Sequence, residues 1–352
     1  MTSRSESARR SESAKNLIRV NATSIDVTSS NAITFGYMSE LARAGRIIAG
    51  RHRLQAPLPD ASSRAASGAA GSAYGGSLWR AEALWSGQPV LVELLDPAIA
   101  DDASLTELFM AEARAASGVS SPFVSRVLDF GIESSAPFLI TELDAAEAGD
   151  IGPRFRDTLA TRIAARHLPS FAEFAHVFHD VSRGVEAMHA RNVFHRDLRS
   201  DRVTLLRART ASAPEREAAK LSFGISKILN DTLELVRTMA RRSVAPASTP
   251  QYASPEQVLG TAPLGVASDV WSLAIIAFEA LTGELPFAGA TVGERLVQIC
   301  AGPARIPSSL AALPPGFDAW FARGVEKSPA DRWASVREMS EALLDLGPSS
   351  LR

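Results

Sequence analysis

The segment from Val193 to Leu205, VFHRDLRSDRVTL, places one carboxylate, Asp197, among several arginines. An aspartate in this setting could be the general base that takes a proton from a hydroxyl nucleophile during phosphoryl transfer. That chemistry also needs positive charge around the transferred group, which other parts of the chain must supply. The question is whether Asp197 is a working base or the remnant of one.

Length and composition bound the answer. The chain has 352 residues, of which 46% are hydrophobic, so it can fill one large domain or two lobes. Its one cysteine, Cys300, excludes an internal disulfide and fits a reducing cytosol. The net charge of -2 and the pI near 6.3 give no broad basic field, so we expect neither nucleic acid nor a membrane surface as partner.

The two ends and one internal stretch differ from the rest in composition. The first residues lack the apolar core of a signal peptide, and no run approaches 18 uninterrupted apolar residues, so we expect a soluble, cytoplasmic protein. Residues 1–45 are rich in Ser, Arg, Asn and Thr, which predicts a mostly disordered tail. Residues 56–72 form an insert of small residues, and residues 348–352 are a short tail.

The first patterned half of the chain predicts strands around one helix. Alternating or apolar runs predict strands at 51–54, 76–81, 87–95, 123–131 and 137–143. Residues 101–117 predict a helix that begins with a capping box of Ser104 and Glu107. Leu105, Leu108 and Glu112 share one face of it, so an acid points inward and needs a partner.

The second half is predicted to be helical. Ser170 and Glu173 form a capping box, and apolar residues then recur at spacings of three and four up to Met188. Residues 269–281, DVWSLAIIAFEAL, are apolar nearly all round, which predicts a helix at the centre of a helical lobe. Strands first and helices second favour an α+β protein with segregated lobes.

The order of five motifs resembles the eukaryotic-type protein kinase family in its bacterial Ser/Thr branch. The matching segments, within about residues 47–347, are FHRDL at 194–198, SFG at 222–224, TPQYASPEQ at 249–257, SDVWSLAIIAFEALTGELPF at 268–287 and KSPADRW at 327–333. The resemblance implies a bilobal fold, with a small β-rich N-lobe at 46–143 and a larger, mainly helical C-lobe at 144–347. It also implies that Asp197 holds the position of the catalytic base.

Four residues match positions that hold the fold in the family. These are Arg196 of the HRD-like motif, Asp269 at the start of the buried helix, Glu256 and Arg332. The resemblance implies that the last two form an ion pair within the C-lobe. We therefore expect the chain to keep the architecture of the family.

The residues that would hold a nucleotide depart from the family. In the family, a lysine on one strand holds the nucleotide phosphates and pairs with a glutamate of the next helix. Glu93 replaces that lysine, so the resemblance implies that Glu93 faces another acid, Glu112. Two carboxylates about 4 Å apart repel by about 4 kcal/mol at an effective dielectric of 20. The helix bearing Glu112 is therefore expected to swing away, take up a proton or recruit an arginine. Leu91 replaces a small alanine and narrows the purine slot.

Four further positions complete this degenerate nucleotide cleft. Gly71 and Gly76 fit the glycine-rich loop, with Ala73 at its middle glycine, although a linker of small residues has the same pattern. Glu142, near the end of the last predicted strand, and Asp144, just after it, line the same cleft by resemblance.

The metal ligands are replaced too. Arg202 stands where the family has a metal-binding asparagine, and a guanidinium cannot ligate a cation. Ser222 stands for the aspartate of the DFG motif, so a neutral hydroxyl takes the place of the carboxylate that magnesium usually needs. The sequence therefore predicts no metal site.

Two interpretations remain. In the first, the chain is a pseudokinase, a regulatory module that binds a protein partner such as an active kinase or its substrate, with no cofactor and at most weak metal-independent ATP binding. In the alternative, it is a divergent Ser/Thr protein kinase that uses Mg-ATP and Asp197. Losing several charged groups, each typically worth about 3 kcal/mol in the transition state, favours the first.

Other chemistry-bearing residues have plainer explanations. His176 and His179 lie three apart on the long helix and could suggest a metal, but an exposed helical face explains them better. Arg237, Arg241 and Arg242 could dock a phosphate or an acidic partner, although a solvated loop is the default.

Overall fold

The structure is a computed structural model, and it describes residues 42–58, 77–95, 99–134, 136–143, 157–207, 217–222, 251–261 and 264–347. Gly71, Gly76 and Asp144 of the predicted cleft, the arginines at 237–242 and most of the 56–72 insert lie outside these residues.

The N-terminal lobe is built on an antiparallel sheet with the strand order β1-β2-β3-β4-β6-β5. The strands are β1 Ile47–Ile48, β2 His52–Leu58, β3 Ser77–Ala83, β4 Pro89–Leu94, β5 Val127–Glu133 and β6 Ala136–Glu142. The sheet is curled. β1 and β5 stand at opposite ends of the strand order, yet Arg51, next to β1, forms an ion pair with Asp129 of β5 at 3.3 Å. β2 reaches Leu58, so the first three residues of the predicted insert belong to a strand.

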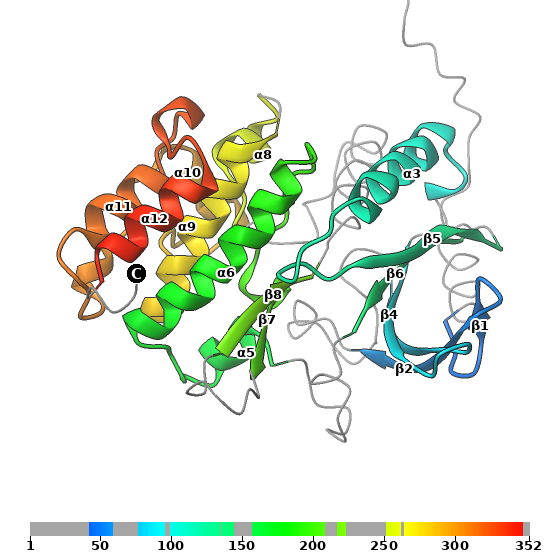
Figure 1. Ribbon diagram of the computed structural model, residues 1–352. Helices are drawn as coiled ribbons and strands as arrows, with labels where there is room; N and C mark the ends of the chain where they lie inside the picture. Colours follow the sequence, from blue (N-terminus) through cyan, green and yellow to red (C-terminus); the bar gives the residue numbers. More distant parts are fainter. Residues whose placement is uncertain are drawn as a thin grey trace, which may run out of the picture. The chain divides into compact units, whose positions relative to one another are not determined.

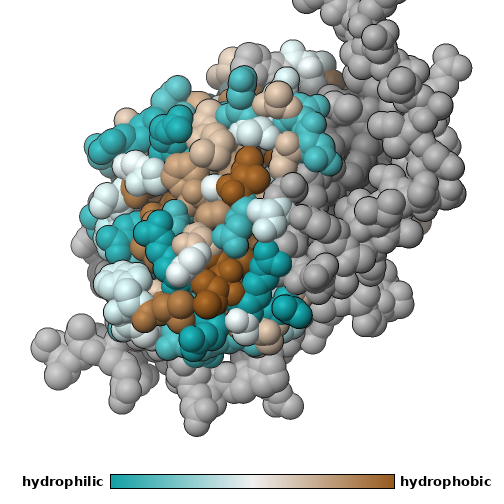
Figure 2. All heavy atoms as spheres, turned by 90° about the vertical axis from the view of Figure 1, so that its right-hand side faces the viewer, coloured by the Kyte–Doolittle hydropathy of each residue, from teal (hydrophilic) through white to brown (hydrophobic). Residues whose placement is uncertain are grey.

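The curled sheet has an apolar side and an exposed side. A separate hydrophobic cluster, which includes Leu54, Trp79 and Ile140, packs inside it. On the face of the molecule turned to the viewer in Figure 2, apolar patches lie among hydrophilic residues. The exposed large apolar residues of these elements are Ile47, Leu84, Trp85, Leu128 and Ile132, and Trp85 is 81% exposed. So exposed a tryptophan is unusual, because this residue is on average highly buried.

The helix of the N-terminal lobe, α3, spans Ala103–Ser117 and packs on β5 (Figure 1). Its N-cap is Asp102, whose carboxylate accepts the N–H groups of Ser104 at 2.8 Å and Leu105 at 3.1 Å. The predicted capping box of Ser104 and Glu107 is therefore wrong. An aspartate two residues earlier already satisfies the free N–H groups of the first turn.

The C-terminal lobe is mainly helical. Its elements are α5 Leu159–Ala164, α6 Phe171–His189, η3 Ser200–Arg202, β7 Val203–Arg207, β8 Glu217–Leu221, α8 Pro255–Leu259, α9 Val266–Thr282, α10 Val292–Ala301, η4 Pro307–Ser309, α11 Phe317–Gly324, η5 Pro329–Asp331 and α12 Val336–Asp345. α6, α9, α11 and α12 pack side by side (Figure 1). α6 begins with the predicted capping box, in which Ser170 and Glu173 each accept a hydrogen bond from the other's backbone N–H.

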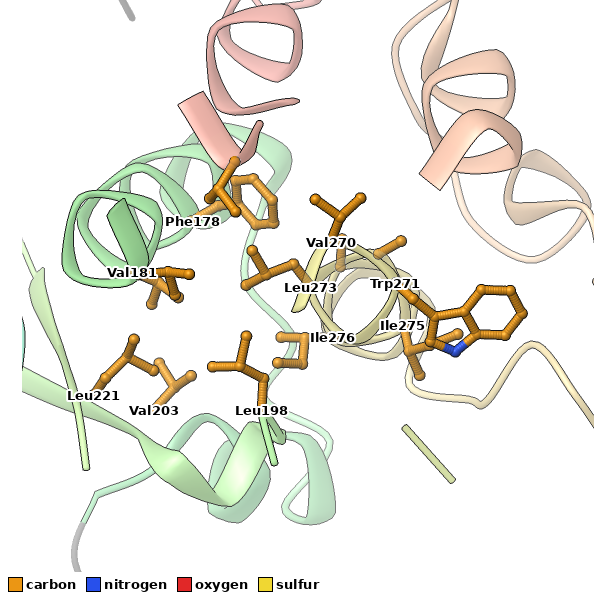
Figure 3. Packing of buried hydrophobic residues seen from close by; sticks show 14 of the residues in the cluster. Phe178, Val181, Leu198, Val203, Leu221, Val270, Trp271, Leu273, Ile275 and Ile276 are labelled. Atoms are coloured by element: carbon orange, nitrogen blue, oxygen red, sulfur yellow. The ribbon is translucent and has the colours of Figure 1, made fainter. Parts of the chain in front are cut away.

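The predicted central helix, α9, is buried along nearly its whole length. Ile276 of α9 lies beside Leu198 of the segment from Val193 to Leu205, and Val181 of α6 lies near Leu221 of β8 (Figure 3). Trp271 points to the opposite side of α9 and stacks on Phe287. The core thus holds this segment at Leu198, near its middle.

Candidate functional site

Asp269 of α9 anchors the loop that carries Asp197. Its carboxylate is fully buried and accepts the backbone N–H of Arg196 at 2.8 Å and that of His195 at 3.0 Å. The ring Nε2 of His189 lies 2.8 Å from the same carboxylate. Arg196 adopts a left-handed backbone conformation, with φ of 59°, which arginine rarely adopts. The hydrogen bonds from α9 hold it there and so fix the direction of the next residue, Asp197.

Two arginines flank the carboxylate of Asp197, whose side chain has no exposed surface. Nη2 of Arg202 lies 3.4 Å from its Oδ2, and Nε of Arg199 lies 3.8 Å from its Oδ1. Arg199 also donates two hydrogen bonds of 3.0 Å to the carboxylate of Asp201. Asp197 is therefore the buried member of a cluster of guanidinium and carboxylate groups whose other members are partly buried.

Arg202 is the centre of this cluster. Burial and the nearby charge of Arg199 oppose its ionisation, but the carboxylates of Asp197, Glu93 and Asp201 outweigh them and raise the pKa of Arg202 above its ordinary value. Arg202 is thus a cation at the position where the family resemblance led us to expect a metal ligand. Arginine has donors and no acceptor, so the residues present do not fit a metal ion at this point.

Ser222 directs its polar groups toward the backbone. Its hydroxyl donates to the carbonyl of Arg202 at 3.2 Å, and its own N–H donates to the same carbonyl at 2.9 Å. Its carbonyl oxygen lies 3.1 Å from Nε2 of His195. Burial lowers the pKa of His195, so the ring is neutral and donates this hydrogen bond. The hydroxyl that replaces the metal-binding aspartate is already in use.

The two acids predicted to face each other are each matched by an arginine of the C-terminal lobe. Oε1 of Glu112 accepts a hydrogen bond of 3.0 Å from Nη1 of Arg196. Glu93 acts electrostatically on Arg202. Of the three expected responses to the missing lysine, α3 follows the third, which is the recruitment of an arginine. The sequence named Arg196 as a scaffold residue but did not pair it with Glu112.

Glu142, which the resemblance assigned to the nucleotide cleft, makes a contact that the sequence did not predict. Nζ of Lys220 on β8 lies 2.5 Å from Oε1 of Glu142, and the backbone N–H of Arg126 donates to the same oxygen at 2.9 Å. Lys220 is only 7% exposed. Its one signal in the sequence is a charged residue in the apolar run AAKL. Leu91 is 6% exposed in β4, opposite Thr141 of β6.

The C-terminal lobe contains the predicted ion pair. Arg332 donates from Nη1 and Nη2 to the two carboxylate oxygens of Glu256, at 2.8 and 2.9 Å, and Nε donates to the carbonyl of Glu326 at 2.8 Å. Burial works against the ionisation of Glu256, but these hydrogen bonds lower its pKa to about 2. The prediction that Glu256 and Arg332 pair is confirmed.

The histidines considered for a metal lie apart from the cleft. Nδ1 of His179 lies 3.3 Å from Oγ of Ser340 on α12. Within the described ranges, His, Cys, Asp and Glu side chains form no group of three or more that could hold a metal ion.

Comparison with known proteins places this geometry in a family. The protein kinase domain family matches residues 75–345, well over half of the chain. The chain belongs to the protein kinase family. The serine/threonine-protein kinase Pkn1 of Myxococcus xanthus is 32% identical over 270 residues, which are 76% of this chain and 36% of Pkn1. PknL of Mycobacterium tuberculosis is 29% identical over 262 residues, 73% of this chain and 58% of PknL.

The solved structures agree on the fold. The crystal structure of the Mycobacterium tuberculosis PknI kinase domain matches with a TM-score of 0.60 at 19% identity and covers 87% of this chain and 99% of that domain. The predicted α+β fold, with a β-rich N-lobe and a helical C-lobe, is confirmed. This protein kinase homologue spans about a third to somewhat over half of the curated relatives' length. Among its described helices, none has both the length and the apolar character required for a membrane span.

Proposed function

We propose that this chain is a pseudokinase, a kinase-shaped module that regulates or docks another protein and does not transfer phosphate. The observation that carries the proposal is the guanidinium of Arg202, only 13% exposed, next to the buried carboxylate of Asp197. A magnesium ion about 4 Å from this guanidinium would be repelled by about 8 kcal/mol at an effective dielectric of 20. In this proposal the positive charge of Arg202 takes the place of the magnesium ion that a kinase binds from solution.

The nucleotide loses its contacts in the same way. Glu93 puts a negative charge where a triphosphate needs a positive one, and Leu91 fills part of the purine slot. We therefore expect no cofactor, and any ATP binding should be weak and independent of metal.

A module of this kind acts through its surface. Its partner is proposed to be a protein, either an active kinase or a kinase substrate, because a chain that keeps a kinase's architecture can still make a kinase's protein contacts. Neither nucleic acid nor a membrane is expected, and the proposed location is the cytoplasm.

One observation favours the alternative of a divergent Ser/Thr kinase. Asp197 keeps its place, and its loop is anchored by Asp269. If Arg202 and Arg199 turned from the aspartates toward a phosphate, they could supply the positive charge that phosphoryl transfer needs. Curated relatives such as Pkn1 are named serine/threonine-protein kinases.

A transfer assay decides between the two. The purified chain with Mg²⁺ or Mn²⁺ and labelled ATP should transfer no more phosphate to itself or to generic protein substrates than an Asp197→Ala variant does. As a positive comparison, Glu93→Lys, Arg202→Asn and Ser222→Asp together restore the missing phosphate and metal ligands. Transfer by the wild type that Asp197→Ala abolishes would establish the alternative.

A further inference from the structure

Both lobes contribute buried apolar residues to one hydrophobic core cluster, and they also meet through charged side chains whose signs are segregated. Glu93 of β4, Glu112 of α3 and Glu142 of β6 are acids of the N-terminal lobe. Each acts on a cation of the C-terminal lobe, and these cations are Arg202, Arg196 and Lys220 respectively. Three separate elements of the first lobe are therefore tied to three separate positions of the second.

Two of the contacts are short hydrogen-bonded ion pairs with little access to solvent. Glu112 and Arg196 are 3.0 Å apart, with side chains 18% and 22% exposed. Glu142 and Lys220 are 2.5 Å apart, with side chains 28% and 8% exposed. Such pairs are screened by salt much less than exposed ones, and removing one partner leaves a charge that water cannot fully stabilise.

The third contact is electrostatic and centres on Arg202. Its guanidinium is pulled by Glu93 from the N-terminal lobe and by Asp197 and Asp201 from its own lobe. The two replacements, Glu93 for the family's lysine and Arg202 for its asparagine, therefore compensate each other in charge. The N-terminal lobe gains a negative charge, and the C-terminal lobe gains a positive one.

Backbone hydrogen bonds among the described residues also join the lobes. The N–H of Ser125 donates to the carbonyl of Leu221 at 2.7 Å, and the N–H of Leu221 donates to the carbonyl of Phe123 at 2.8 Å. The charged contacts come from β4, α3 and β6, so they add restraints at positions away from these hydrogen bonds.

We propose that the ion pairs Glu112–Arg196 and Glu142–Lys220, assisted by the attraction between Glu93 and Arg202, form a charge latch that holds the two lobes in one closed arrangement without nucleotide or metal. This proposal rests on the proposed function in one respect. Because the chain is proposed not to bind Mg-ATP, the arginines and the lysine of the latch remain paired with their carboxylates when Mg-ATP is present. A protein partner would then meet a surface across both lobes that is always in the same conformation, so partner binding would not depend on the level of ATP.

The latch can be measured as a distance between the lobes. Nitroxide labels on Ala111→Cys in α3 and Glu341→Cys in α12, both exposed positions, report the lobe separation in a Cys300→Ser background by double electron–electron resonance. The latched chain gives one narrow distance distribution that Mg-ATP leaves unchanged. Glu112→Gln should raise the population of longer distances about tenfold, which corresponds to about 1.4 kcal/mol.

Two further variants separate the latch from general damage. Exchanging the partners, Glu112→Arg with Arg196→Glu, should narrow the distribution again relative to Glu112→Gln alone. Arg53→Gln breaks an ion pair with Glu82 inside the sheet and should change nothing. A wild-type distribution that is broad, or one that Glu112→Gln leaves narrow, would overturn the latch.

The outcome is distinguishable from a failure of the proposed function. A narrow distribution together with stabilisation by Mg-ATP would contradict the pseudokinase and keep the latch. A broad distribution without nucleotide binding would contradict the latch and keep the pseudokinase.

Discussion

The substitution Asp197→Asn separates a structural carboxylate from a catalytic one. At about 4 Å, one carboxylate–guanidinium pair is worth about 4 kcal/mol at an effective dielectric of 20. Removing one partner of a buried pair typically costs about 3 to 5 kcal/mol. Arg199 keeps Asp201 at 3.0 Å, and Arg202 keeps the charge of Glu93, so the net loss should be smaller, about 2 kcal/mol.

Urea unfolding followed by far-UV circular dichroism measures this loss as a lower midpoint with an unchanged slope. The matched control is Asp157→Asn, which removes an exposed pair with Arg162 and should cost less than about 1 kcal/mol. Groups kept for catalysis are often held at a cost in stability, so their neutral replacement leaves stability unchanged or raises it. Either result for Asp197→Asn would refute the structural role argued here.

Two further predictions concern the C-terminal lobe. Because the pKa of Glu256 falls from 4.5 unfolded to about 2 folded, its ion pair with Arg332 stabilises the fold above pH 4.5, and about 3 kcal/mol is lost as the pH falls from 4.5 toward 2. In Glu256→Gln, acid titration of the unfolding free energy should lack that loss; an unaltered acid profile would contradict the pairing. Gly184→Ala should destabilise the fold by about 2 kcal/mol, because the new Cβ would lie 2.8 Å from the carbonyl oxygen of Phe123. The control Gly293→Ala places its Cβ in open space and should leave stability unchanged or raise it. Equal melting temperatures for the two glycine variants would show that the first contact relaxes freely.

Local signals in the sequence were sufficient for several elements. The capping box of Ser170 and Glu173 marks the start of α6, because both residues act within one turn. The segment from Asp269 onward is apolar nearly all round, which predicts the burial of α9, since such a helix has almost no polar face to expose. The same locality explains the error at α3, where Asp102 was a better cap than the predicted Ser104.

The partners of the cleft residues could not be read in the same way. Arg196 and Glu112 are 84 residues apart, and Lys220 and Glu142 are 78 apart, so neither pair leaves a periodic signal. A long side chain can reach several acids, and the choice depends on where the backbone places it. The sequence therefore indicated that Glu112 needs a partner, while the left-handed backbone at Arg196 determined which one it finds.

A thermal-shift titration with ATP, with and without Mg²⁺, measures whether the chain binds a metal-bound nucleotide. With Arg202 as a resident cation, the melting temperature should be the same in both series at every ATP concentration. A melting temperature that rises only with Mg²⁺ and grows with the logarithm of ATP concentration would contradict the pseudokinase. Such binding would stabilise the fold by about 2.7 kcal/mol at an ATP concentration a hundred times the dissociation constant.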